Sequence, residues 1–211
     1  MKIAVIDYGM GNLRSVSKAL EHVAPHARVE VTSDAAAVSG ADRVVFPGQG
    51  AMPDCMREME ARGLRPAVLE AAAAKPFLGI CIGLQMLFEA SEEGDVRGLS
   101  VLQGRVRRFP REAMFDRDGG RLKVPHMGWN EVRQQTPHPL WSGIDDGTRF
   151  YFVHSYYAEV SDVRRVSGVC EYGLPFTCAV ARDNIFAVQF HPEKSHNAGL
   201  RLLTNFVDWN P

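Results

Sequence analysis

The sequence predicts an α/β fold with a mixed, mainly parallel central sheet flanked by helices and a smaller antiparallel sheet in the C-terminal half. Apolar strand-like runs alternate with helix-like segments as far as about residue 90, which is typical of a parallel, doubly wound sheet. These runs are nearly continuous, as expected of strands covered on both faces. Beyond that point the strand-like segments are shorter and glycine turns recur, which indicates antiparallel or mixed pairing.

The N-terminal elements follow from apolar periodicity and from turn residues. The first strand runs to Asp7 and is followed by the loop at residues 8–12. Ser33 or Asp34 caps a short helix over the alanines that follow. The other predicted elements of this half are helix 13–23, strand 27–31, strand 43–46, helix 52–62, helix 66–74, strand 76–80 and helix 82–90.

The C-terminal half is rich in turns. Asp118-Gly119-Gly120 and Asp146-Gly147 are hairpin signals. The predicted strands are 149–154, 163–169, 177–182 and 185–190, and an amphipathic helix at 197–209 places Leu200, Leu203, Phe206 and Val207 inward. We find no repeat or linker, so residues 1–211 are predicted to form a single domain.

Composition argues against several kinds of partner. A formal net charge of −1 gives no reason to expect nucleic acid or a membrane surface. The early apolar run at residues 3–6 is too short for a signal peptide, so we expect a cytoplasmic protein. The four cysteines form no C-x-x-C pair, so neither a metal site nor a disulfide framework is predicted. Arg14 breaks the dinucleotide pattern G-x-G-x-x-G, and we expect no cofactor.

The segment at residues 75–90 changes from strand-like to helix-like at Cys81. Gly79 and Gly83 stand two positions either side, which is the nucleophile-elbow pattern G-x-S-x-G with cysteine in place of serine. The elbow would hold the thiol at a helix N-terminus, where free N–H groups favour a thiolate and Ile82 N–H can stabilise an oxyanion. The alternative is a core cysteine beside two packing glycines.

Two further segments support the catalytic interpretation. Pro47-Gly48-Gln49-Gly50 follows a strand at the same predicted sheet edge, and its glycines can expose N–H groups to a ligand. An ordinary turn is the alternative.

His191-Pro192-Glu193 follows another strand, and in an extended segment the histidine and the carboxylate would face the same way. A solvated turn is the alternative here. His154 lacks an adjacent carboxylate, so we expect it to be structural, at the pocket wall. His22, His26, His138 and His196 are expected at the surface, and His126 in a loop.

The motif at residues 79–85 (GICIGLQ) and His191-Pro192-Glu193 resemble those of the triad (class I) glutamine amidotransferases. Within that family the sequence is most similar to the glutaminase subunits of imidazole glycerol phosphate synthase, in histidine biosynthesis. The resemblance runs essentially end to end and includes residues 7–13, 47–56, 126–130, 151–156 and 191–195. It implies a flavodoxin-like fold of the class I amidotransferase type.

The resemblance also implies roles for particular residues. Cys81 would attack the side-chain amide of glutamine, His191 would transfer the proton and Glu193 would orient the imidazole. The oxyanion hole would comprise Ile82 N–H and the Gly48-Gln49 peptide, which in this family needs a flip. Relatives usually carry a small aliphatic residue where this chain has Gln49, so the side chain of this loop departs from the family pattern while the backbone chemistry is kept. The positions that hold the amino-acid end of the substrate in the family are Gly50, Gln85, Glu93, Ser155 and Tyr156.

The sequence leaves no segment for a domain that binds an ammonia acceptor, so we expect a partner to supply it. The resemblance implies a heterodimer with the cyclase subunit, a (β/α)8 barrel that receives ammonia and makes imidazole glycerol phosphate and an aminoimidazole carboxamide ribotide. Asn12, Trp129 and Lys194 match family positions at that contact. Independently, a tryptophan in a glycine-flanked loop suits an interface anchor, although a local packing cap is the alternative.

Three alternatives stay open on sequence grounds. The chain could serve another synthase, such as those of pyridoxal phosphate or anthranilate, although residues 7–13 and the M-G-W-N segment argue against both. It could be a flavodoxin-like stress-response or peptidase protein with an elbow cysteine, although His191-Pro192-Glu193 and Gln85 argue against that. A noncatalytic binding module would be favoured only if Cys81 were unreactive.

Overall fold

The computed structural model describes residues 1–110, 112, 114–116 and 118–211. Its parallel core consists of five strands hydrogen-bonded in the order β2 (Arg28–Thr32), β1 (Lys2–Ile6), β3 (Arg43–Gly48), β4 (Phe77–Cys81) and β14 (Ile185–Val188), counted within those described residues. Every residue of β3, β4 and β14 is buried, which explains why their sequences are apolar without alternation.

The central sheet continues beyond β14 with antiparallel pairing. The strands follow in the order β13 (Leu174–Arg182), β11 (Tyr156–Val160), β7 (Gly104–Arg108), β5 (Ala90–Ser91) and β6 (Val96–Arg97), with β5 parallel to β7. β12 (Val166–Tyr172) pairs with β13 and with β9 (Arg133–Gln134). A separate antiparallel sheet joins β8 (His126–Glu131) to β10 (Arg149–His154). The predicted fold class is therefore confirmed, although most antiparallel strands extend the central sheet instead of forming another one.

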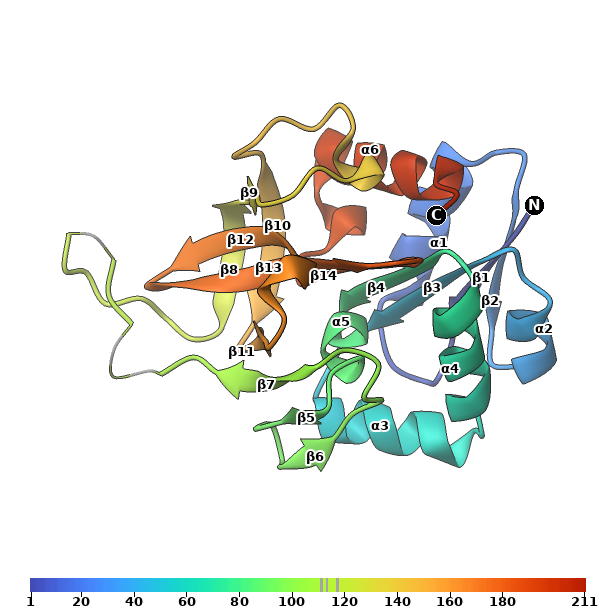
Figure 1. Cartoon of the computed structure of the whole chain (residues 1–211), viewed down its shortest axis with the longest axis horizontal. Helices are drawn as coiled ribbons and strands as arrows, with labels where there is room; N and C mark the ends of the chain where they lie inside the picture. The colour runs from blue at the N-terminus through green and yellow to red at the C-terminus, as the bar shows by residue number, and fades with distance from the viewer. Residues whose placement is uncertain (111, 113, 117) are drawn as a thin grey trace.

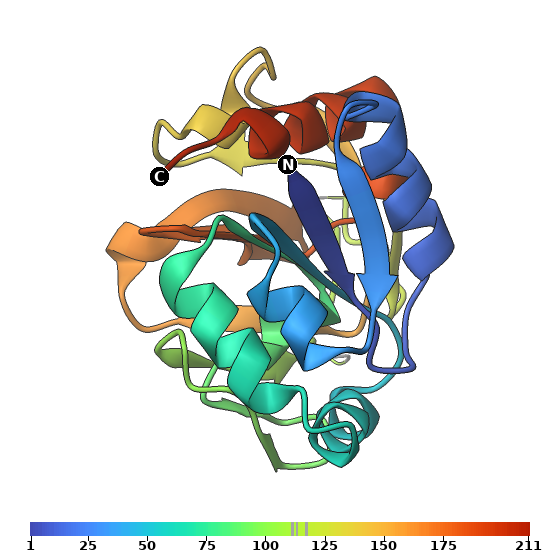
Figure 2. The same ribbon diagram turned by 90° about the vertical axis from the view of Figure 1, so that its right-hand side faces the viewer.

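Helices cover both faces of the parallel strands (Figures 1 and 2). α1 (Leu13–Val23) and α6 (His196–Asp208) pack together on one face, and α2 (Ala35–Ser39) and α4 (Arg65–Ala74) on the other. α3 (Met52–Ala61) lies against α5 (Ile82–Met86), and the 3-10 turns include η2 (Pro139–Trp141), η3 (Val163–Arg165) and η4 (Pro192–Lys194). Among the described residues, no helix has the length and apolar character needed to cross a membrane.

Local signals predicted most helix boundaries correctly. Asp34 caps α2 by accepting a hydrogen bond from the Ala36 amide at 2.9 Å. The inward face of α6 was predicted only in part: Leu203, Phe206 and Val207 are buried as expected, but Leu202 is buried and Leu200 is only half-buried.

The helix after Cys81 is shorter than predicted. α5 ends at Met86 instead of reaching residue 90. The backbone oxygens of Met86, Leu87 and Phe88 accept hydrogen bonds from amides of residues 99–102, so they are not available to a longer helix. This non-local competition is not visible in the apolar periodicity of the segment.

Four smaller predictions were wrong. Residues 163–165 form η3, whose first turn is capped by Asp162, so the strand begins only at Val166. The M-G-W-N segment is strand β8 instead of a loop, because β10 supplies its hydrogen-bond partners, and His126 consequently lies in a strand. His138 is half-buried against the rings of Phe186 and Trp209 instead of lying free at the surface.

Candidate active site

The candidate nucleophile lies at the carboxyl edge of the parallel strands. Gly48 at the end of β3 pairs in register with Cys81 at the end of β4, and Ile80 pairs with Val188 at the end of β14. His191 follows shortly after β14, so the chain brings this histidine to the same edge as Cys81. Open α/β sheets place their ligands at this edge.

Cys81 has the strained backbone that the elbow pattern predicts. Its φ is 56° and its ψ is −110°, which is an outlier for a residue other than glycine. A Cβ atom at Gly79 would lie 2.9 Å from Cβ of Ala187, and one at Gly83 would overlap the backbone oxygen of Phe46. Glycine at both positions therefore lets α5 pack against β3 and β4 while Cys81 makes the sharp turn between them.

His191 and Glu193 pair as predicted, but the backbone between them differs from the prediction. His191 Nδ1 lies 2.9 Å from Glu193 Oε1, and their side chains are 4% and 1% exposed. Pro192–Lys194 forms the 3-10 turn η4 instead of an extended segment, because the Lys194 amide donates to the His191 carbonyl. The turn brings the carboxylate to Nδ1 and leaves Nε2 for the pocket.

The electrostatic environment favours a charged His191. Burial opposes the charge, but the Cys81 and Glu193 side chains outweigh it and raise the pKa of His191 to about 10. Among the described residues, His191 Nε2 is buried without a close hydrogen-bond partner, so its contact with Cys81 combines charge with a weak hydrogen bond. A protonated imidazole at neutral pH stabilises a neighbouring thiolate. Because α5 has only five residues, we assign this effect chiefly to His191 and less to a helix dipole than the sequence suggested.

A pocket of about 320 Å³ opens at Cys81 and His191. It contains all the residues predicted to bind substrate, together with Gln49 and Ile82 of the predicted oxyanion hole and His154 in its wall. Its lining residues are Gln49, Gly50, Cys81, Ile82, Gln85, Glu93, Pro125, Val153, His154, Ser155, Tyr156 and His191.

Gly48 and Glu193 lie behind the pocket lining. A Cβ atom at Gly48 would lie 2.8 Å from Cβ of Ile82, so this glycine lets β3 approach the start of α5. Gln49 is exposed, and its carbonyl accepts a hydrogen bond from Cys55 Sγ at 3.7 Å.

Two polar side chains in the pocket wall, those of Glu93 and Gln85, are fixed by hydrogen bonds to the protein and still offer an oxygen atom to a ligand. Glu93 Oε2 accepts a hydrogen bond from the Met52 amide at 2.8 Å, and burial raises the pKa of this carboxyl. Gln85 donates through Nε2, but its Oε1 atom is buried without a hydrogen-bond partner in the described part of the chain. A buried acceptor without a partner is costly unless a ligand or water uses it.

Sequence reasoning missed two buried residues at the site. Gln189 Nε2 lies 3.7 Å from Cys81 Sγ, and the Tyr8 hydroxyl donates to the Pro47 carbonyl at 2.8 Å. Gln189 did carry a signal, since it is the polar residue inside the apolar run 185–190. Tyr8 carried none, because its contact joins two strands that are distant in the sequence.

Two of the three residues predicted to face a partner share one surface cluster. Trp129 is 43% exposed, and its ring stacks on His196 at 4.9 Å and meets the Tyr151 ring edge-on at 6.1 Å. Lys194 Nζ lies 6.0 Å from the centre of the Tyr151 ring. Asn12 immediately precedes α1, which packs against the η4 turn that contains Lys194.

Met127 was not singled out in the sequence. It is 62% exposed and lies two residues before Trp129 on β8, so both side chains project from the same face of the strand. The exposed apolar surface around Trp129 is therefore larger than predicted.

Comparison with known proteins assigns the chain to a class. The family model for class-I glutamine amidotransferases matches residues 4–209, so the chain belongs to this family. It is 72% identical over 209 residues to the imidazole glycerol phosphate synthase subunit HisH of Dechloromonas aromatica, covering 99% of this chain and 97% of that protein. It is 67% identical to the HisH subunits of Thiobacillus denitrificans and Aromatoleum aromaticum, covering 99% of this chain and 92% and 99% of theirs. Within the amidotransferases the chain is thus a member of the HisH group.

Solved structures agree on the fold. A putative GMP synthase protein from Thermoplasma acidophilum superposes with a TM-score of 0.70 at 17% identity, covering 99% of this chain and 92% of that one. A second structure, described as a glutamine amidotransferase, gives a TM-score of 0.71 at 17% identity, covering 98% and 97% of the two chains. At this identity the likeness concerns the fold alone.

Replacing Gly83 with alanine should destabilise the protein, because the new Cβ would overlap the Phe46 backbone. We expect the free energy of unfolding in urea to fall by about 3 kcal/mol. The matched control is Gly63→Ala, which has φ +64° but no atom within 4 Å of the new Cβ; it should cost only about 1 kcal/mol. Equal losses in the two variants would mean that Gly83 is not needed for close packing.

Replacing Glu193 with glutamine should lower the pKa of His191, because one of the groups that raise it is removed. In the wild type the raised pKa stabilises the folded state fully below about pH 6.5, and this contribution is lost as the pH rises through about 10. In the variant this contribution should be smaller and should be completely lost at a lower pH than in the wild type. Titration of the His191 ring nitrogens by ¹⁵N NMR measures the shift, and an unchanged midpoint would show that Glu193 does not hold the charge.

Proposed function

We propose that this chain is the glutaminase subunit of an imidazole glycerol phosphate synthase and supplies ammonia for histidine biosynthesis. The single observation that carries the proposal is the arrangement of Cys81 on a strained elbow beside His191, whose Nδ1 is held by Glu193, in one pocket. The high identity to HisH subunits over nearly the whole chain supports the same function.

The proposed reaction is amide hydrolysis through a thioester. The Cys81 thiolate attacks the side-chain carboxamide carbon of glutamine, and the C–N bond breaks while the His191 imidazolium gives its proton to the departing nitrogen, so ammonia leaves. Neutral His191 then removes a proton from water, which attacks the glutamyl thioester. The products are glutamate and the restored thiolate–imidazolium pair. Glu193 keeps the Nδ1 proton in place throughout and stabilises the imidazolium.

The oxyanion formed in each step needs hydrogen-bond donors. Ile82 opens α5 and lines the pocket, so its amide is one of the first-turn N–H groups that have no partner within the helix. The amide of Gln49, in the Gly48-Gln49 peptide, is the second proposed donor. Because the Gln49 side chain is exposed, its identity leaves the backbone chemistry possible.

Recognition of the amino-acid end of glutamine is assigned to Gly50, Gln85, Glu93, Ser155 and Tyr156, which all line the pocket. The unpartnered Gln85 Oε1 atom is a suitable acceptor for the substrate ammonium group. The Glu93 carboxylate, already fixed by the Met52 amide, offers a second acceptor.

The proposed partner is the cyclase subunit, a (β/α)8 barrel that takes the ammonia and makes imidazole glycerol phosphate and the aminoimidazole carboxamide ribotide. We assign its contact to Asn12, Trp129 and Lys194, and add Met127, because exposed aromatic and methionine side chains are enriched at interfaces. We further propose that residues 1–211 act as one amidotransferase domain in a cytoplasmic heterodimer. The four cysteines are free and buried, which suits a reducing compartment.

Replacing Cys81 with alanine should reduce glutaminase activity to background, because no thioester can form. Synthesis by the complex with ammonium salts in place of glutamine should persist, since ammonia then needs no hydrolysis step. Cys178→Ala, which removes a buried thiol outside the pocket lining, is the matched control and should retain both activities. Loss of ammonia-dependent synthesis in an assembled Cys81→Ala complex would contradict this division of labour.

Replacing Trp129 with alanine should weaken association with the cyclase subunit by about tenfold or more in Kd, as for an aromatic interface anchor. The unfolding midpoint should change little, because the residue is 43% exposed and its ring packs on surface side chains instead of in the core. Val31→Ala, on the edge strand β2 of the central sheet, on the opposite side of the molecule from β8 (Figure 1), removes an apolar side chain of 42% exposure and serves as the control. Titration calorimetry measures both, and equal Kd values would remove Trp129 from the interface.

A further inference from the structure

One backbone carbonyl fixes the direction of a long chain of hydrogen bonds. The Tyr156 backbone oxygen accepts from His154 Nδ1 at 2.8 Å and from Gln85 Nε2 at 3.1 Å. A carbonyl oxygen can only accept, so the proton of His154 must be on Nδ1 and the NH₂ group of Gln85 must face Tyr156.

The chain leads from Tyr156 towards the nucleophile. The second hydrogen of Gln85 Nε2 points to Gln189 Oε1 at 2.9 Å. Gln189 must therefore present its own NH₂ group to Cys81 Sγ, at 3.7 Å. A flipped Gln189 amide would put two donors face to face, and Gln189 is fully buried, so no solvent would relieve that contact.

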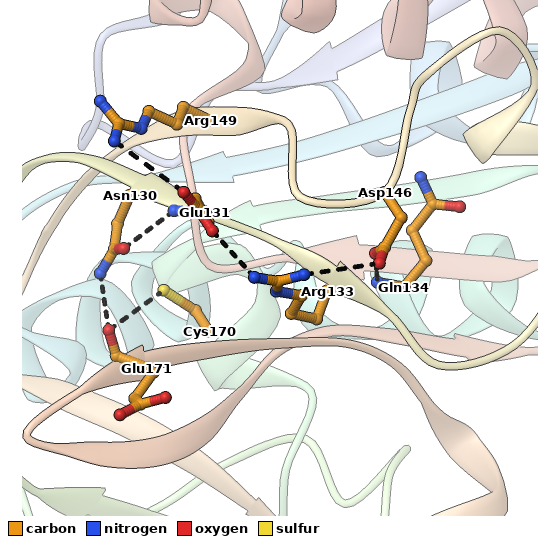
Figure 3. A network of polar contacts seen from close by, with 8 residues as sticks. All are labelled: Asn130, Glu131, Arg133, Gln134, Asp146, Arg149, Cys170 and Glu171. Atoms are coloured by element: carbon orange, nitrogen blue, oxygen red, sulfur yellow. Dashed lines mark hydrogen bonds and ion pairs between the residues drawn. The ribbon is translucent and has the colours of Figure 1, made fainter.

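The chain leads in the other direction to strand β8. A His154 protonated on Nδ1 can only accept at Nε2, so His126 must donate to it from Nδ1, at 3.0 Å. His126 Nε2 is then an acceptor and faces Asn130 Nδ2 at 3.3 Å. Asn130 Nδ2 also donates to the Glu171 carbonyl at 2.8 Å, which fixes the orientation of the amide (Figure 3).

Both histidines are neutral at physiological pH, as this pattern requires. Burial lowers the pKa of His126 to about 4 and that of His154 to about 3. The His126 ring lies between those of Tyr172 and Phe152, at 4.0 and 4.9 Å, so it has little freedom to turn. A neutral imidazole offers one donor and one acceptor, and here each has a partner.

We infer that this chain of hydrogen bonds, from Asn130 through His126, His154, Tyr156 and Gln85 to Gln189, orients a donor onto the Cys81 sulfur. The inference rests on the proposed function of Cys81 as nucleophile. Gln189 contacts the reacting sulfur and stabilises its thiolate, and the other members are positioning residues that act through it. Hydrogen bonds to charged groups are about twice as strong as neutral ones, so the contribution rises when the thiolate forms.

The chain of hydrogen bonds also links the nucleophile Cys81 to the proposed partner surface around Trp129. Asn130 follows Trp129 on β8, and because side chains alternate along a strand, Trp129 faces outward while Asn130 faces the buried His126. Asn130 is not among the residues that line the Cys81 pocket. A partner that shifts β8 at Trp129 therefore changes the hydrogen bond at Cys81 without touching the pocket.

Two variants test the chain of hydrogen bonds, one at each of its ends. Gln189→Met keeps the side-chain length but removes the donor at Cys81. Asn130→Asp keeps the shape but replaces the donor to His126 with an acceptor. Glu131→Gln is the control, since the Glu131 side chain on the same strand forms exposed ion pairs with Arg133 and Arg149 and is not one of the links described above (Figure 3).

The readout is alkylation of Cys81 by iodoacetamide in the full-length chain, followed as a function of pH by peptide mass spectrometry. The thiolate is the reacting species, so the profile reports thiolate stabilisation. Cys55, Cys170 and Cys178 are internal references, because they are buried and their pKa values are raised by burial.

We expect Gln189→Met to move the alkylation profile to higher pH and to slow the reaction at neutral pH about tenfold, the size of one hydrogen bond to a charged group. Asn130→Asp should act in the same direction, by about threefold. Glu131→Gln should match the wild type. A folded Asn130→Asp variant with the wild-type profile would overturn the proposed chain of hydrogen bonds. An unchanged profile in Gln189→Met would overturn it as well.

A second measurement needs no variant. Long-range ¹⁵N NMR spectra of the wild-type chain should show His126 and His154 both neutral with the proton on Nδ1. A proton on Nε2 of His154 would overturn the inference whatever the variants do. Neither experiment uses glutamine, so the two proposals can fail separately. If the variants shift the alkylation profile but the wild-type protein hydrolyses no glutamine with the cyclase subunit, the hydrogen-bond inference is retained and the proposed function is refuted.

Discussion

The backbone strain at Cys81 is the constraint on which the rest of the site depends. A residue with φ of 56° at the end of a buried strand costs of order 1–3 kcal/mol and persists only where its surroundings enforce it. Here Gly79 and Gly83 allow β4, β14 and α5 to approach closely enough to do so. The strained backbone sets the direction of the Cys81 side chain, because a less sharp turn would point the sulfur into the sheet instead of into the pocket.

The groups around this sulfur form two arms with different electrostatic character. The His191–Glu193 arm is charged and short, and its members are almost completely buried. The arm through Gln189 and Gln85 is neutral and long, and it crosses from the elbow to the small β8–β10 sheet. The buried His191–Glu193 pair supplies the proton for the reaction. The neutral network, whose hydrogen bonds are satisfied, keeps the groups around the sulfur in position without the desolvation cost of further charges.

The sequence predicted features that depend on neighbouring residues and missed those that depend on distant ones. The elbow, the His191–Glu193 pair and the cap at Asp34 are local, so residue type and spacing reveal them. The end of α5 at Met86 could not be predicted, because residues 99–102 compete for its carbonyl groups. The M-G-W-N segment resembled a loop because glycine weakens a strand signal, and only pairing with β10 makes it a strand. Gln189 faces Cys81 through tertiary packing, which residue spacing does not encode.

The most direct test of the account is to locate the covalent intermediate. The complex with the cyclase subunit would be mixed with glutamine, quenched in acid within the first turnovers and digested for mass spectrometry. The account predicts a γ-glutamyl adduct on the peptide that contains Cys81, formed and then lost as glutamate appears. Glutamine hydrolysis without an adduct at Cys81, or with the adduct on Cys55, Cys170 or Cys178, would contradict it.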